Sequence, residues 1–171
     1  MSNSNAQTFK ASLDVTSKII TAAVLMLFIY LMFRFRQYTD MPVVFRILIP
    51  VIFLVTAIGS WLYRSLSYEL QKLCLVIRRP VGNFTIPYTE IASVRRVDRK
   101  ELGTLIRTWG SGGMFGYYGH FRSTRLGKIR LFTTRRSGLV LIATTDKDLI
   151  LLSPDDDTFA DHLRQKLMTA A

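Results

Sequence analysis

Two long apolar runs near the N-terminus constrain the fold of this chain more than any other feature. They cover residues 19–33 and 47–63, which are 15 and 17 residues without a charge. Helices of these lengths approach the roughly 30 Å hydrocarbon core of a bilayer, and charged residues at their ends can reach the headgroups. We therefore predict a transmembrane helical hairpin over residues 18–64, with helices at 18–36 and 42–63.

The residues around the two runs favour an uncleaved membrane anchor. Lys18 and Arg34 bound the first run. Tyr38 on one side and Trp61 and Tyr63 on the other suit the aromatic belts at the two interfaces. The alternatives are two buried helices of a soluble core and a cleaved signal peptide. A signal peptide is disfavoured because Arg34 stands where a small-residue cleavage site is expected, and a second run follows at once. The short connection 37–41 requires the helices to run antiparallel.

Basic residues beside the hairpin predict its orientation. Six lie on the side of the two termini and three near the connection, namely Lys10, Lys18, Arg64, Lys72, Arg78 and Arg79 against Arg34, Arg36 and Arg46. Cytoplasmic flanks of membrane helices carry an excess of Lys and Arg. We therefore expect both termini in the cytoplasm and the chain in the cytoplasmic (inner) membrane.

The remaining polar part has the length of one small domain and is strongly basic. Residues 65–171 contain 17 Lys and Arg against 10 Asp and Glu, which accounts for +7 of the net charge of +11. Such a domain beside a bilayer is expected to attract anionic lipid headgroups first and nucleic acid second. Cys74 is the only cysteine, which excludes an intrachain disulfide and a zinc site built from several thiolates.

Hydrophobic patterning predicts several short strands in this domain, and the run at 139–143 is continuously apolar, as in a strand buried on both faces. We expect them at about 73–79, 84–87, 94–97, 128–134, 139–143 and 148–152. The last three are joined by short turns, which indicates a meander of sequential neighbours. The segment 1–17 is expected to be a polar N-terminal tail that leads into the first helix.

One amphipathic helix is predicted at the C-terminus. Ser153 can cap it, Pro154 suits the first helical position, and the aspartates that follow suit the positive end of the helix dipole. Phe159, Leu163 and Leu167 then recur on one face. The polar domain is thus predicted to be α+β, with antiparallel strands and one helix packed on a sheet.

A glycine-rich and aromatic segment at 109–127 is the most unusual part of the domain. Six of its 19 residues are glycine. We interpret it as a loop, which is either a tight structural turn or a binding loop whose aromatic side chains enter lipid or contact a peptide. The candidate binding residues are Trp109, Phe115, Tyr117, Tyr118 and Phe121.

Clusters of basic residues form a second candidate site. They are either scattered solvated charges or one lipid-facing patch, in which each Lys or Arg near an anionic surface contributes on the order of 1 kcal/mol. The candidates are Arg78, Arg79, Arg95, Arg96, Arg122, Arg125, Lys128 and Arg130.

Residues 65–168 resemble the bacterial pleckstrin-homology-like (PH-like) domains of small membrane proteins. The similar segments are 86–91 with Val94, the Gly-Tyr-Tyr-Gly segment 116–119, and 153–155 with Phe159 and Leu163. The resemblance implies a PH-like antiparallel β-barrel or sandwich closed by a C-terminal helix, after an N-terminal hairpin. It implies no enzyme activity. Phosphoinositide recognition is not implied, because Arg78 and Arg79 lack the basic-x-Arg spacing of the eukaryotic domains.

No catalytic, cofactor or metal site is predicted. His120 and His162 belong to no recognised nucleophile or carboxylate motif, and helix capping accounts for the aspartates at 155–157. The sequence therefore predicts a membrane-anchored, non-enzymatic PH-like module, whose partners are anionic lipid headgroups, an unidentified protein or a second copy of the chain. The alternatives are an accessory or regulatory subunit of a transport complex and a membrane-tethered nucleic-acid binder. Nucleic acid is disfavoured because no recognised nucleic-acid motif is present.

Overall fold

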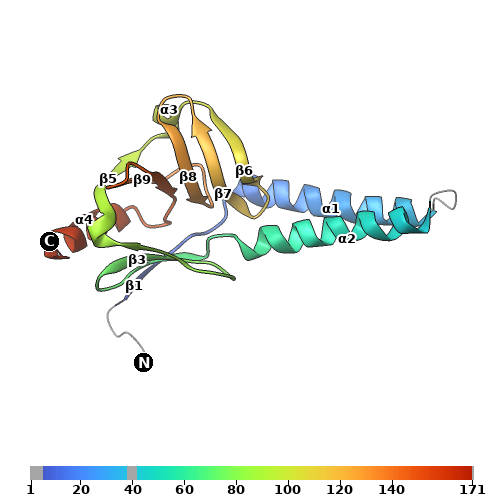
Figure 1. The fold of residues 1–171 in the computed structure, drawn as a ribbon, viewed down its shortest axis with the longest axis horizontal. Coiled ribbons are helices and arrows are strands. Elements are labelled where there is room, and N and C mark those ends of the chain that lie inside the picture. Colours follow the sequence, from blue (N-terminus) through green and yellow to red (C-terminus); the bar gives the residue numbers. More distant parts are fainter. Residues whose placement is uncertain (1–5, 38–41, 171) are drawn as a thin grey trace.

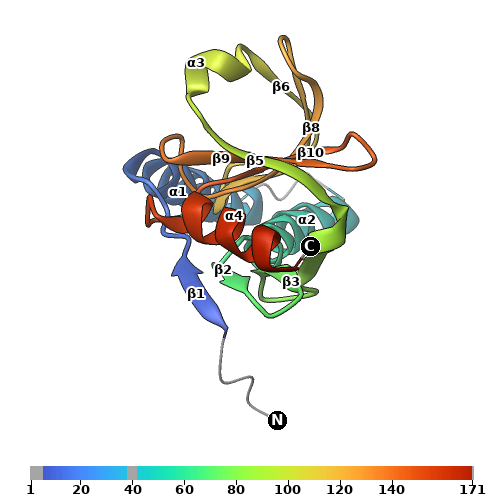
Figure 2. The same cartoon turned by 90° about the vertical axis from the view of Figure 1, so that its left-hand side faces the viewer.

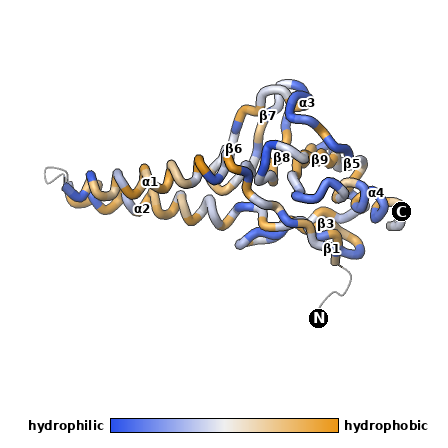
Figure 3. Tube along the Cα trace, turned by 180° about the vertical axis from the view of Figure 1, so that it is seen from behind, coloured by the Kyte–Doolittle hydropathy of each residue, from blue (hydrophilic) through white to orange (hydrophobic). Residues whose placement is uncertain are grey.

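Two long antiparallel helices extend from a β-rich domain (Figure 1). The computed structural model describes residues 6–37 and 42–170. Helices α1 (Val15–Gln37) and α2 (Val43–Leu62) are long and apolar enough to cross a membrane, and apolar residues cover most of their length (Figure 3). In the most apolar 18-residue stretch of each helix, only 11% of the residues of α1 and 0% of those of α2 are buried. This exposure argues against helices of a soluble core. The expected connection 37–41, with Tyr38, lies largely outside the described residues.

A four-stranded antiparallel sheet forms the layer nearest the N-terminus. Its strands, in spatial order, are β1 (Gln7–Lys10), β2 (Ser67–Leu70), β3 (Cys74–Arg78) and β4 (Phe84–Pro87). Strand β1 comes from the segment expected to be a tail, and that expectation is wrong for residues 7–10. The reason is packing, because Phe9 is buried with its ring 5.1 Å from that of Phe159. Residues of the expected strand 73–79 pair with β2 through a turn at 71–73.

A six-stranded sheet forms the second layer. Its strands are β5 (Ile91–Val97), β9 (Leu139–Thr144), β10 (Leu149–Leu152), β8 (Gly127–Thr133), β7 (Gly116–Ser123) and β6 (Leu105–Gly113), in spatial order. The expected meander is wrong, because β10 lies between β9 and β8 and runs parallel to β8. The domain is an α+β sandwich whose sheets do not close into a barrel.

Three short or terminal helices complete the domain. They are η1 (Tyr88–Glu90), α3 (Arg99–Leu102) and α4 (Phe159–Ala170). Helix α4 lies at the end of the molecule opposite the helical hairpin (Figure 1), and Phe159 and Leu163 enter the core between the two sheets. The helix begins later than Ser153, where the sequence predicts its start. Ser153 is fully buried, and its hydroxyl accepts a hydrogen bond from the backbone N–H of Thr134 at 2.8 Å.

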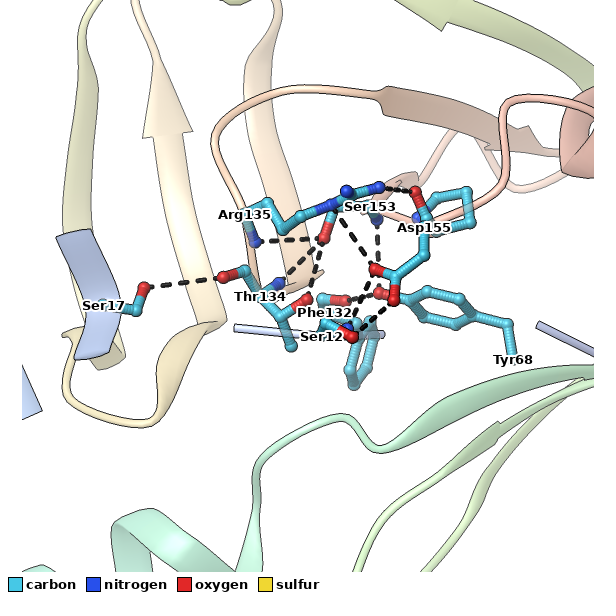
Figure 4. Close-up of polar contacts among 9 residues, drawn as sticks. Ser12, Ser17, Tyr68, Phe132, Thr134, Arg135, Ser153 and Asp155 are labelled. Carbon is cyan, nitrogen blue, oxygen red and sulfur yellow. Dashed lines mark hydrogen bonds and ion pairs between the residues drawn. The ribbon is translucent and has the colours of Figure 1, made fainter. Parts of the chain in front are cut away.

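A buried polar network joins the two sheets to the start of α1 (Figure 4). The hydroxyl of Tyr68 on β2 donates to the carbonyl of Phe132 on β8 at 2.6 Å and accepts from the N–H of Ser153 at 3.2 Å. The neighbouring carbonyl of Thr134 accepts from the N–H of Asp14 at 3.2 Å and from the hydroxyl of Ser17 at 3.5 Å. These bonds position the domain against the first turn of the helical hairpin.

Candidate functional site

The glycine–aromatic segment forms a β-hairpin, so the expectation of a loop is wrong. Strands β6 and β7 pair from Leu105–Ser123 to Gly113–Gly116, with a bulge at Arg107 and Trp109. Gly110 and Gly119 face each other in this pairing. A Cβ on Gly110 would lie 2.1 Å from the carbonyl oxygen of Tyr118. The glycines therefore allow two backbones to approach in a positive-φ conformation, and they serve strand pairing here.

Alternation along β7 divides its aromatic residues between the two faces of the six-stranded sheet. Tyr118 and His120 stand opposite Phe132 and Arg130 of β8 on the face toward the four-stranded sheet. Tyr117 and Phe121 belong to the apolar cluster on the other face. Successive side chains of a strand point to opposite faces, so the candidate residues predicted as one set lie on two surfaces.

The hairpin β6–β7 contacts both of the long apolar helices, α1 and α2. At its tip, the N–H of Phe115 donates to the hydroxyl oxygen of Thr21 on α1 at 2.9 Å. Next to it, Gly113 has no room for a side chain, because a Cβ would lie 2.9 Å from the side chain of Ile20. The hydroxyl of Tyr118 donates to the carbonyl of Ser60 in the last turn of α2 at 2.8 Å. The candidate residues of β7 are thereby held where the domain meets the hairpin.

A cavity of about 600 Å³, which we call the junction pocket, lies where α2 meets the two sheets. It is lined by Gly59 of α2, Tyr63 directly after α2, Arg79 after β3, Trp109 of β6 and Arg130 of β8. A Cβ on Gly59 would meet no atom within 4 Å, so the helix leaves this side open. Trp109 is 62% exposed. The pocket thus has an aromatic and helical side and a basic side.

Two partly buried arginines form the basic side. The guanidinium of Arg130 lies 4.3 Å from the ring centroid of Phe84 and 5.1 Å from that of Phe132, and Arg79 lies 5.8 Å from Phe132. Burial and the nearby charge of Arg130 lower the pKa of Arg79. Burial also lowers the pKa of Arg130, although Asp148 opposes this. Both side chains remain charged, because an arginine pKa lies far above neutrality.

Neither arginine forms an ion pair among the described residues, although Asp148 lies near enough to Arg130 to act on its charge. Among the described residues, those lining the junction pocket include no aspartate or glutamate. Arg79 donates one guanidinium N–H to the carbonyl of Gly82, whereas its Nε is buried with no hydrogen-bond acceptor. A buried, unpaired donor of a cation is costly unless an anion or water satisfies it. The chemistry of this side of the pocket is therefore that of an anion site.

Other members of the predicted basic patch are neutralised or lie elsewhere. Ion pairs join Arg78 to Glu69 at 2.8 Å, Arg95 to Glu101 at 2.7 Å and Arg96 to Asp161 at 2.6 Å. Arg122 and Lys128 are exposed register partners on β7 and β8, and Arg125 donates to the carbonyl of Lys100 at 2.9 Å. Of the eight predicted basic residues, the structure places Arg79 and Arg130 in the junction pocket.

Sequence reasoning missed several residues of this pocket. Tyr63 was assigned to a membrane interface, and His120 was not connected to any site. Phe132 and Arg130 alternate with apolar residues along β8, and this period could have shown that they share a face. Phe115, a predicted binding residue, lies at the hairpin tip with φ of 56° and does not line the pocket.

The two histidines lie apart in the domain, His120 on β7 and His162 on α4. His162 packs 5.7 Å from the ring of Phe9 and contacts the carbonyl of Thr158. Across residues 6–37 and 42–170, no three His, Cys, Asp or Glu side chains gather as metal ligands would. Asp155 accepts a hydrogen bond from the N–H of Ser12 at 2.9 Å, so it positions the N-terminal segment.

Comparison with known proteins gives one match. The model of the bacterial PH domain family matches residues 66–167, which is more than half of the chain. The matched region begins before β2 and ends within α4, and it contains Arg79, Trp109 and Arg130. No curated protein and no solved structure matches the chain.

Proposed function

The chain belongs to the bacterial PH domain family, and we propose that it is a membrane-anchored, non-enzymatic module whose junction pocket binds the headgroup of an anionic phospholipid. One observation carries the proposal. Arg79 and Arg130 lie together, without a carboxylate, in a pocket whose other wall is the last turns of an apolar helix.

The position of the pocket along α2 supports a lipid as the ligand. If α2 crosses the bilayer, its last turn reaches the headgroup region, since 20 residues of helix span about 30 Å. Gly59 and Trp109 then lie at the depth of the upper acyl chains and the interface, where tryptophan is favoured. The arginines lie on the domain side of the same cavity. A phospholipid could place its phosphate on the arginines and its chains along α2.

Electrostatics supports an anionic headgroup. Two guanidiniums that share a partly buried site repel each other, and each has lost part of its hydration. A phosphate offsets both costs, because its oxygens accept the paired N–H groups of arginine. The remaining net charge of the domain would attract an anionic leaflet and orient the pocket toward it.

We place the pocket at the cytoplasmic face of the inner membrane. The excess of basic residues on the side of the two termini favours this orientation. Leu73 is 70% exposed on the domain surface, so Leu73→Cys in a Cys74→Ser background provides a reporter. A membrane-impermeant thiol reagent should label it only after the cells are opened. Labelling of intact cells would reverse the assigned orientation.

Tryptophan quenching in nanodiscs tests the lipid site directly. The chain has two tryptophans, so the Trp61→Phe variant leaves Trp109 as the only reporter in the pocket. Lipids with a spin-labelled headgroup should quench Trp109 strongly when the headgroup is anionic and weakly when it is neutral. The variant Arg79→Gln/Arg130→Gln loses two charges at about 1 kcal/mol each, so its preference for anionic over neutral lipid should be about thirtyfold weaker.

A variant with the same change in charge controls for general attraction to the surface. Lys72 and Arg122 are exposed and line neither this pocket nor the cavity on the opposite face of the sheet. Lys72→Gln/Arg122→Gln should keep the preference for anionic lipid. Equal quenching by neutral and anionic lipids, or equal losses in the two double variants, would refute headgroup binding in the junction pocket.

A further inference from the structure

A second cavity, which we call the basic hollow, lies on the opposite face of the six-stranded sheet. Its volume is about 370 Å³, within the range of small-molecule sites. Tyr117, Phe121 and Leu131 form part of its apolar wall, on the face that does not meet the four-stranded sheet. In the view along the long axis, this face lies inside the curve from β5 to β6, below α3 (Figure 2).

Four arginines from three separate elements line the basic hollow. They are Arg99 of α3, Arg107 of β6, and Arg135 and Arg136 after β8. No aspartate or glutamate occurs among the described lining residues. The fold therefore brings together four positive charges from three separate segments of the chain, around an apolar wall.

Arg136 is held in a defined position over an aromatic ring. Its Nε donates to the hydroxyl of Tyr117 at 2.7 Å, and its guanidinium carbon lies 5.0 Å from the centroid of the same ring. These contacts use one of its donor nitrogens, and the terminal nitrogens have no partner among the described residues. A guanidinium that is already positioned in this way loses little further conformational freedom when it binds an anion.

Arg135 is also held, and it retains an unsatisfied donor. Its Nη2 donates to the carbonyl of Pro154, and Asp155 lies 3.6 Å from its Nε. That Nε is buried and makes no hydrogen bond. Arg107 and Arg99 have no ion pair or hydrogen bond of their side chains within the described residues. Among the described residues, the ion pair of this group is that of Arg135 with Asp155, so the charges of the other three arginines have no ion-pair partner.

From this arrangement we infer that the basic hollow binds a phosphorylated ligand at a site separate from the junction pocket. Phosphate oxygens accept the paired donors of Arg107 and Arg136, and an apolar or ring-shaped part of the ligand packs on Tyr117 and Phe121. Arginine suits this role because its planar fork binds phosphate through two N–H groups and its flat face stacks on aromatic rings. The basic hollow faces away from α2, so its ligand is a second one, distinct from the phospholipid proposed for the junction pocket.

The phosphate could belong to a soluble small molecule or to a lipid headgroup. Two probes distinguish these sources, namely inorganic pyrophosphate and a water-soluble short-chain phosphatidic acid. Binding of each is measured by calorimetry on the full chain in nanodiscs of neutral lipid, at about 0.15 M salt so that weak surface attraction is screened. Pyrophosphate binding identifies a soluble ligand class, and binding of the short-chain lipid alone identifies a headgroup.

Three variants test the location of the site. Arg107→Gln/Arg136→Gln should weaken binding of the active probe by about tenfold or more, which corresponds to losing about one charge-assisted contact. Tyr117→Phe removes the hydroxyl that holds Arg136 and should weaken binding less. Arg79→Gln/Arg130→Gln should leave pyrophosphate binding unchanged. Because the junction pocket is itself proposed to bind anionic headgroups, the lipid probe is measured in this background, where its remaining binding should depend on Arg107 and Arg136, so a failure here is separate from a failure of the junction pocket.

The proposal is overturned if neither probe binds saturably. It is also overturned if Arg107→Gln/Arg136→Gln binds as the unchanged protein does, or if Lys72→Gln/Arg122→Gln loses as much affinity, since binding would then follow net charge alone. Arg107 and Arg136 are exposed. An unchanged thermal unfolding midpoint of their variant would confirm that a loss of binding reflects the site.

Discussion

The hydroxyl of Tyr68 provides the sharpest test of how the two sheets are held together. Tyr68 is fully buried on β2, and its hydroxyl bridges Phe132 of β8 and Ser153 after β10 (Figure 4). Tyr68→Phe removes only this oxygen and keeps the ring that packs 5.7 Å from Phe159. The variant therefore isolates the polar bridge from the hydrophobic core.

Of the two groups that bond the Tyr68 hydroxyl, the N–H of Ser153 is affected most by its removal. The carbonyl of Phe132 keeps a second donor, the hydroxyl of Ser65 at 3.3 Å, whereas the N–H of Ser153 loses its acceptor in a fully buried position. A buried donor without a partner costs about 1–3 kcal/mol. Taking about 2 kcal/mol for a domain of about 100 residues, the unfolding midpoint should fall by roughly 8–16 °C.

Thermal unfolding of the full chain in a mild detergent, followed by the circular dichroism of the sheets, measures this loss. Tyr30→Phe is the matched control, because it removes the same atom from a side chain that is 58% exposed on α1. Hydrogen exchange at the amide of Ser153 reports the bridge itself. If Tyr68→Phe unfolds at the same temperature as Tyr30→Phe with this amide still protected, the bridge does not carry the stability assigned to it.

Alkaline pH tests the same hydroxyl in another way. Burial raises the pKa of Tyr68 to about 12, although its hydrogen bond with Ser153 opposes this. The unfolded value is near 10, so the neutral hydroxyl contributes stability that is complete below pH 10 and lost as pH rises toward 12. The shift of about two pH units corresponds to about 3 kcal/mol. Tyr68→Phe should lose less stability than the unchanged protein over this interval. A loss equal to that of the unchanged protein would contradict the assignment.

Three further predictions concern the hairpin, the membrane helices and acid stability. Gly110→Ala should lower the unfolding midpoint of the domain, because the new methyl group would lie 2.1 Å from a backbone carbonyl at a φ of +115°; an unchanged midpoint would contradict the close pairing of β6 and β7. Leu54→Arg places a charge on the exposed side of α2 and costs about 2.5–3.5 kcal/mol at a bilayer centre, so it should reduce the fraction of protein that resists alkaline extraction from membranes, whereas Leu73→Arg on the domain surface should not. Glu69→Gln should lose less stability than the unchanged protein as the pH falls below about 4. The hydrogen bond with Arg78 lowers the pKa of Glu69, and its contribution to stability disappears as the carboxylate is protonated. If the free energy of unfolding of the variant and of the unchanged protein falls equally with pH, this prediction is wrong.

The candidate site was only partly predictable from the sequence. Arg79, Arg130, Trp109 and Tyr118 were all singled out, but as members of two unrelated sets, a basic patch and an aromatic loop. Pairing of β6, β7 and β8 brings Trp109, Tyr118 and Arg130 to one face, and the turn after β3 adds Arg79. Tyr63 was outside both sets, because its place in the pocket depends on how α2 meets the sheet.

By itself, the sequence determined the properties that depend on local chemistry. The length of the apolar runs predicted α1 and α2 almost to their ends, and hydrophobic patterning with turn residues predicted the strands around 84–87, 139–143 and 148–152. The α+β class and the resemblance to bacterial PH domains follow from the same local patterns. These features were accessible because helix and strand periods arise within a few neighbouring residues.

Tertiary structure decided which segments pair and which faces they share. Only the fold placed β10 between β9 and β8, and only the packing of Phe9 turned part of an expected tail into β1. The glycines of 110–119 favour a turn when considered alone. Gly110 nevertheless permits the two strands to approach, because it faces Gly119 across the hairpin. Strand pairing depends on partners that are distant in the chain, and a local period carries no information about them. For the same reason, the two arginine-lined cavities exist only once the sheets are assembled.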